Sequence, residues 1–154
     1  MRRTDDGWSP QAFFPRLTPA EATAVAGFAR EESFAEGERL CVAGEPATRC
    51  WLLHSGQINV CTGVPGRGEV VVQTLGPGDV LGLSWLVPPY RWQFGATAAG
   101  PGSAAVLDTV RLRAFAAEDP RFGHELVLTL FEALFHRLNA TRARLLDLYR
   151  NPDA

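Results

Sequence analysis

The chain has 154 residues, of which 46% are hydrophobic and 21% are charged, and its formal net charge is -2. This length suffices for one domain with a sizeable core, and no basic excess favours direct nucleic-acid binding. No apolar run approaches the roughly 20 residues that span a bilayer, and no secretory signal follows the N-terminal Arg pair. The three widely spaced Cys residues imply no disulfide framework, so a reduced, cytoplasmic protein without membrane attachment is expected.

The N-terminal region predicts a lead-in followed by a short helix. Residues 1–17 include Trp8 and Phe13-Phe14, and we expect them to dock on the body of the protein. In residues 17–30, Thr18 is suited to cap a helix, Pro19 suits its first turn, and Glu21 completes a capping box. Residues 18–150 are predicted to form a single domain.

The middle of the chain, from about residue 34 to 112, has the residue pattern of a β structure. Apolar runs of a few residues alternate with Gly, Pro, Asp and Ser, as strands alternate with tight turns. The run Gln57–Thr62 alternates polar and apolar residues, which is typical of a half-buried strand. No long helices separate the runs, so a parallel α/β sheet is disfavoured. The pattern predicts a mainly β fold, an antiparallel β-roll of the double-stranded β-helix or jelly-roll type.

The last part predicts one long helix over about residues 120–149. Asp119 is suited to cap it and Pro120 suits its first turn. Apolar residues recur at every fourth position and occupy a second side as well: Phe122, Leu126, Leu130, Leu134 and Leu138, with Leu128, Phe131 and Phe135. So wide an apolar arc predicts cover from the β body and from a second copy of the chain, giving a homodimer through this helix. The alternative is that all of it is intramolecular core.

Three segments marked by glycines recur along the β region: "FAEGERLCVAGEP", "LLHSGQINV" and "LGPGDVLG". Their pattern resembles that of the cyclic nucleotide-binding domain, the sensory module of the catabolite-activator and related regulators. "FAEGERLCVAGEP" is similar to the opening strands, "LLHSGQINV" to a strand, Ser-Gly turn and strand, and "LGPGDVLG" to the turn before the ligand cassette. The similarity covers roughly residues 10–150. It implies a β-roll flanked by a short N-terminal and a long C-terminal helix. Taken alone, these glycines indicate turns and not a ligand.

The resemblance locates a cassette whose chemistry is altered here. In the family, a Gly-Glu pair opens the cassette and a Pro-Arg element follows about ten residues later. The Glu accepts a hydrogen bond from the ribose hydroxyl, and the Arg pairs with the cyclic phosphate. This chain keeps Gly82, but Leu83 replaces the acid, and Trp92 stands where the Arg is expected, with Arg91 one residue earlier. Neighbouring strand residues face opposite ways, so this shift points Trp92 into the pocket and Arg91 away.

Three interpretations of the cassette remain open. Trp85 and Trp92 fill the vacated cavity, or they line a pocket for another small ligand. Alternatively, slack in the Pro88-Pro89 turn lets Arg91 hold the phosphate of cAMP or cGMP. The candidate ligand-binding residues are Gly82, Leu83, Ser84, Trp85, Arg91, Trp92 and Gln93. Loss of both the acid and the cation favours lost or altered nucleotide affinity, because a buried phosphate without a partner is costly.

No catalytic or metal site is expected. His54, His124 and His136 are scattered, and His54 is predicted to be an exposed turn residue. The cysteines fit small buried strand positions. No nucleophile triad or phosphate loop is present.

The function we expect is a non-enzymatic regulatory module that acts through protein partners. No helix-turn-helix follows the long helix, so a stand-alone module is expected. The alternatives are a ligand-independent scaffold, a true cAMP or cGMP regulator using Arg91, and a DNA-binding regulator that lacks its reader domain.

Overall fold

The computed structural model describes residues 9–151, so Trp8 lies outside the described residues. Two four-stranded antiparallel sheets form the body, in the orders β1-β8-β3-β6 and β2-β7-β4-β5. The predicted antiparallel β-roll is therefore confirmed. The strands are β1 (Ala29–Phe34), β2 (Arg39–Cys41), β3 (Arg49–Ser55), β4 (Ile58–Val64), β5 (Gly68–Leu75), β6 (Val80–Leu81), β7 (Gly95–Ala98) and β8 (Gly102–Asp108).

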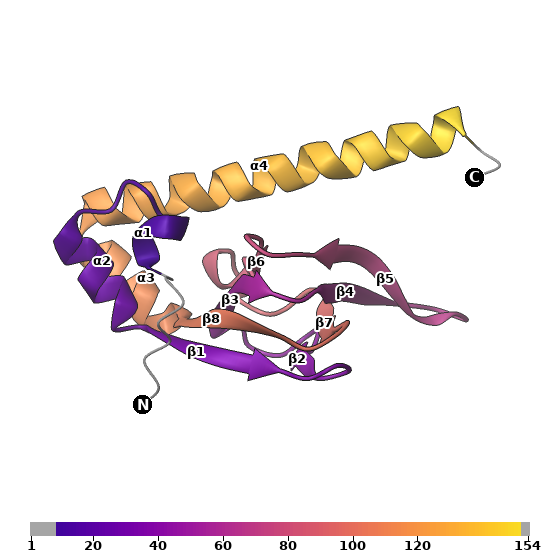
Figure 1. Ribbon diagram of the computed structural model, residues 1–154, viewed down its shortest axis with the longest axis horizontal. Helices are drawn as coiled ribbons and strands as arrows, with labels where there is room; N and C mark the ends of the chain where they lie inside the picture. The colour runs from indigo at the N-terminus through magenta and orange to yellow at the C-terminus, as the bar shows by residue number, and fades with distance from the viewer. Residues whose placement is uncertain (1–8, 152–154) are drawn as a thin grey trace.

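The helical elements are α1 (Pro10–Phe13), α2 (Pro19–Ala26), the 3-10 turn η1 (Ser84–Leu86), α3 (Thr109–Glu118) and α4 (Pro120–Arg150). The helices α1, α2 and α3 gather at one end of the roll, and α4 starts there and runs along the length of the sheets (Figure 1). The long C-terminal helix is present as predicted, and Asp119 caps it by accepting from the Phe122 N–H at 3.1 Å. None of the helices in residues 9–151 is long and apolar enough to cross a membrane.

The structure corrects two of the expected element boundaries. Strands begin at Ala29 rather than near residue 34, because the edge strand β1 pairs along its whole length with β8. They end at Asp108 rather than at residue 112, because the Asp108 side chain accepts from the Val110 and Arg111 N–H groups and starts α3. An Asp at the end of an apolar strand thus serves as the N-cap of the next helix.

The lead-in packs on the body through Phe14, which is 1% exposed, and through Leu17. Thr18 caps α2 as predicted, since its hydroxyl accepts from the Glu21 N–H at 3.2 Å. The expected role of the Glu21 side chain in a capping box is wrong, however. Its carboxylate is buried and accepts from the guanidinium of Arg121 on α4. A tertiary ion pair has therefore replaced a local bond and ties α2 to α4.

Candidate functional site

The indole of Trp92 occupies the space beside the opening of the cassette. Trp92 is only 7% exposed, and its six-membered ring lies against Gly82 so closely that a Cβ added at Gly82 would be 2.7 Å from two ring atoms. On another side it packs against Trp51 of β3, with ring centroids 5.8 Å apart. The structure thus places Trp92 inward, in contact with the residue that opens the cassette.

Arg91 lies on the outside and is engaged by the backbone of a neighbouring loop. Its Nη1 donates to the Gly44 carbonyl at 2.8 Å, and its side chain is exposed. The Trp92 N–H donates to the Glu45 carbonyl and the Gly44 N–H donates to the Trp92 carbonyl, at 2.9 and 2.7 Å. This strand-like pairing sets which of the two neighbouring side chains faces in.

The cassette starts with a short turn in which the Gly82 carbonyl already has a hydrogen-bond donor. Gly82 has a φ of +95°, which a residue with a side chain rarely adopts. The turn η1 follows, and it buries Trp85, whose Nε1 donates to the Gly82 carbonyl at 2.9 Å. Leu83 and Ser84 are half-buried beside it. The indole of Trp85 therefore takes up one of the backbone acceptors of this turn.

The predicted site residues are brought together only in part. Gly82, Trp85 and Trp92 meet in the core, whereas Arg91 and Gln93 are exposed on the other side of the segment. No guanidinium from the cassette itself points toward Gly82 in the described structure, because Arg91 is held at Gly44. In the resembled family, a Glu and an Arg of the cassette bind the sugar-phosphate. Neither has a counterpart among these cassette residues.

A cation beside the Trp51–Trp92 pair comes from a residue that sequence reasoning missed. Arg49, at the start of β3, places its guanidinium 5.1 Å from the ring centroid of Trp51, which is itself in contact with Trp92. Such stacking is a favourable cation–π contact. Arg49 lies more than 30 residues before the cassette in a run that predicts only a strand. Nothing in the sequence alone signals this placement.

The cysteines and His54 lie on strands and contribute to the fold. Cys41, Cys50 and Cys61 are buried on strands, as expected. Burial raises the pKa of Cys41 to about 11 and that of Cys50 to about 12, so neither thiol is activated. The expectation that His54 is an exposed turn residue is corrected: it is half-buried on β3, and its Nε2 contacts Glu31 Oε1 at 2.8 Å. No cluster of metal-ligating residues occurs within residues 9–151.

A hollow also links the cassette turn to the helices. Trp85 and Leu86 of η1 line it together with residues of α3 and with Leu126 and Val127 of α4, and its volume is about 500 Å³. At the far side of the cassette, Arg137 of α4 donates to the carbonyl of Val80 in β6. Burial lowers the pKa of the Arg137 guanidinium, although Asp79 nearby acts in the opposite direction. The helix α4 therefore lines a hollow together with η1 and bonds to β6, the strand that precedes the cassette.

Comparison with known proteins shows which family has this fold. The family model of the cyclic nucleotide-binding domain matches residues 31–119. A CRP-like cAMP-activated global transcriptional regulator of Mycobacterium tuberculosis is 25% identical over 135 residues, which cover 88% of this chain and 58% of the regulator. The chain thus spans less than two thirds of the length of that relative.

Solved structures resemble the fold over most of the chain. A Geobacter metallireducens protein described as cyclic nucleotide-binding superposes with a TM-score of 0.75 at 25% identity, covering 82% of this chain and 91% of its own. The catabolite activator protein of Thermus thermophilus superposes with a TM-score of 0.65 at 21% identity, covering 88% and 63%. At 21% identity, this second likeness concerns the fold alone.

Proposed function

The chain belongs to the cyclic nucleotide-binding domain family, and we propose that it is a regulatory module whose cassette has lost ordinary affinity for cyclic nucleotides. The observation that carries this proposal is the position of Trp92, packed between Gly82 and Trp51. An indole in this space excludes the sugar-phosphate, and Arg91 would have to leave the Gly44 carbonyl to reach an anion there. A phosphate buried without a cation is disfavoured by several kcal/mol, about the whole affinity of a weak ligand.

Calorimetric titration of the full chain with cAMP and with cGMP tests this proposal. We expect no saturable binding below about 1 mM, because the acid and the cation are both replaced. Micromolar binding of either nucleotide would overturn the proposal. It would then favour the alternative of a true cyclic nucleotide regulator in which Arg91 turns inward.

The module is proposed to act through proteins and not through catalysis. Two features support a readout at α4: the hollow that Trp85 and Leu126 both line, and the hydrogen bond from Arg137 to the Val80 carbonyl. A change at η1 or β6 would therefore act directly on the long helix. The raised pKa values of Cys41 and Cys50 argue against a thiol nucleophile.

A second proposal, assembly of a homodimer through α4, rests on the part of that helix from Phe131 onward. Phe131, Leu134, Phe135 and Leu138 recur at the spacing of one helix face, and each is at least 45% exposed. Leu145 and Leu148 continue the same seven-residue repeat. A seam of this kind is typical of two helices packing side by side. If the cassette is a filled core, a scaffold function through this seam would remain.

A further inference from the structure

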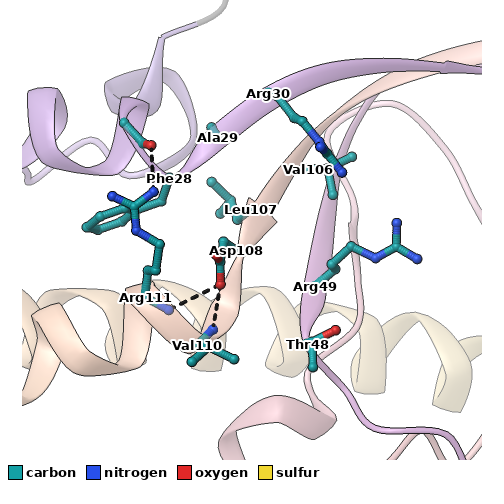
Figure 2. Close-up of a pocket in the computed structure, with 11 residues that line it drawn as sticks. Phe28, Ala29, Arg30, Thr48, Arg49, Val106, Leu107, Asp108, Val110 and Arg111 are labelled. Carbon is teal, nitrogen blue, oxygen red and sulfur yellow. Dashed lines mark hydrogen bonds between the residues drawn. The ribbon is translucent and has the colours of Figure 1, made fainter.

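A second cavity, separate from the cassette, carries a concentration of positive charge. It has a volume of about 510 Å³ and lies where β1, β8 and the start of β3 meet the first turn of α3. Arg30, Arg49 and Arg111 line it, against a single carboxylate, that of Asp108. No residue between Gly82 and Gln93 lines it. The three cations come from three separate elements, so only the fold brings them together (Figure 2).

Two of these cations belong to one face of the first sheet. Arg30 pairs with Val106, and Val106 pairs with Trp51, while Asp108 pairs with Arg49. Paired residues and residues two apart on a strand share a face, so the two arginines lie diagonally across β8. Figure 2 shows Arg30 and Arg49 extending to one side of the cavity, with Val106 between them. They form its cationic end.

Arg49 is the better placed of the two to receive an anion. Its guanidinium is stacked on Trp51 and has no hydrogen bond or ion pair among residues 9–151. The stack leaves its N–H groups, which are arranged as a planar fork, available for a phosphate or carboxylate. Arg30 is paired with Glu32 at 2.9 Å, but both side chains are at least 36% exposed, and exposed pairs exchange easily.

The remaining polar groups explain why the anion would bind at this end only. Asp108 is turned toward α3, where it accepts from the N–H groups of Val110 and Arg111. The Arg111 guanidinium turns to the opposite side, where it lies 4.8 Å from the Phe28 ring centroid and donates to the Gly27 carbonyl. Thr48 adds a hydroxyl beside Arg49. Ala29, Val106, Leu107 and Val110 provide apolar lining between the two ends.

We propose that this cavity binds a small phosphorylated organic molecule, with its phosphate monoester held between Arg49 and Arg30 and its organic part against the apolar lining. The volume is within the usual range for small-molecule sites and far exceeds the needs of a lone phosphate. A monoester carries close to two negative charges at neutral pH, which matches two guanidinium groups at one end of the cavity. No cassette residue lines the site, although Arg49 is stacked on Trp51, which packs against Trp92; Arg30 has no such link and so reports on this cavity alone.

Calorimetric titration of the full chain with ribose 5-phosphate, AMP and inorganic phosphate tests this proposal. At low ionic strength we expect saturable binding of at least one organic phosphate below about 1 mM, and weaker binding of inorganic phosphate. Arg49→Ala and Arg30→Ala should each weaken it by about tenfold, as expected for a lost charge-assisted hydrogen bond. Both residues are exposed, so the variants should fold, and circular dichroism checks this.

Arg67→Ala is the matched control, because Arg67 is an equally exposed arginine in the turn between β4 and β5. It should bind as the wild type does. Three results would overturn the proposal: no saturable binding of either organic phosphate up to about 10 mM, equal weakening by Arg67→Ala and Arg49→Ala, or inorganic phosphate binding as tightly as ribose 5-phosphate. None of these results would bear on the cAMP titration, which tests the cassette.

Discussion

The six-membered ring of Trp92 takes the space that a Cβ at Gly82 would need, although the two residues are at opposite ends of the cassette. The contact leaves no room for a side chain at Gly82, whose φ of +95° also favours glycine. In the cyclic nucleotide-binding domains that the sequence resembles, this glycine opens the ligand site. In this protein it also accommodates an indole, so one small residue now serves the packing of the core.

Gly82→Ala should destabilise the protein by about 2–4 kcal/mol, because the new Cβ meets Trp92 and the backbone conformation is strained. Gly78→Ala is the control: Gly78 has a φ of +90°, but nothing lies within 4 Å of an added Cβ. There we expect only the conformational cost, about 1 kcal/mol. Urea unfolding measures both. Equal losses would show that the Trp92 contact is unimportant.

Trp92→Ala separates a filled core from a ligand pocket. If the indole is core, as its 7% exposure suggests, truncation should cost about 3–5 kcal/mol. The neighbouring Phe94→Ala, at a residue 45% exposed, should cost less than about 1 kcal/mol. Chemical denaturation of the two variants supplies the comparison. A loss at Trp92 as small as that at Phe94 would instead favour a pocket-lining side chain.

Removal of Arg121 should be far more damaging than removal of an ordinary surface arginine. The Glu21 side chain is 6% exposed, and Arg121→Ala would leave its carboxylate buried without its partner. We expect the free energy of unfolding to fall by about 2–4 kcal/mol. The fall is smaller than for a fully buried pair because Arg121 is half exposed. Arg39→Ala breaks the exposed pair with Glu69 and should cost about 1 kcal/mol or less. Similar losses for both variants would contradict the prediction.

Leu138→Glu should shift the protein from dimer to monomer if α4 forms the proposed seam. The substitution places a charge on the repeat formed with Phe131 and Leu145, where a partner helix would bury it. Leu146→Glu, one position off that repeat on an equally exposed part of α4, should leave the dimer in place. Sedimentation velocity over a concentration series checks this. A wild-type chain that is monomeric throughout would refute the seam.

Stability should fall as the pH rises above about 9, and Cys50 should account for part of the fall. Burial raises the pKa of the Cys50 thiol to about 12 from 9.0, so the unfolded chain loses this proton first. The contribution of the Cys50 thiol to the free energy of unfolding is therefore present in full below pH 9. It is lost as the pH approaches 12, by about 1.4 kcal/mol per pH unit. Cys41, whose pKa burial raises to about 11, adds to the fall in the same window, whereas the chain has no Lys and only two Tyr.

Urea unfolding at pH 8, 9 and 10, chosen around the ordinary thiol pKa, measures this dependence. Cys50→Ala should flatten the pH profile, whatever it does to stability at pH 8. An unchanged slope in this variant would contradict the assignment.

Local chemistry made several elements predictable. Thr18 with Pro19, and Asp119 with Pro120, indicate helix starts because their side chains or rings act within one turn of the backbone. The β-roll followed from short apolar runs between glycines. The start of α3 was missed because Asp108 ends an apolar run, and only its bonds to Val110 and Arg111 show that it caps a helix.

The cassette could be located from the sequence but not understood from it. A glycine with Leu83 after it, and a tryptophan in place of an arginine, indicated altered chemistry. Which of Arg91 and Trp92 faces inward depends on the register against Gly44 and Glu45, nearly fifty residues away. Register shifts of one residue reverse the face of a strand, and no local signal encodes them.

Residue types at positions marked by glycines are enough to indicate the family and the replacement of the two residues that hold a sugar-phosphate in it. The indole beside Gly82 and the second cavity shared by Arg30, Arg49 and Arg111 become visible only in the folded chain. These features depend on residues that are far apart along the chain. Turns and helix caps are formed by residues close together in the sequence. Which way a side chain points, and which charged residues lie near one another, depends on strands that pair across the whole domain.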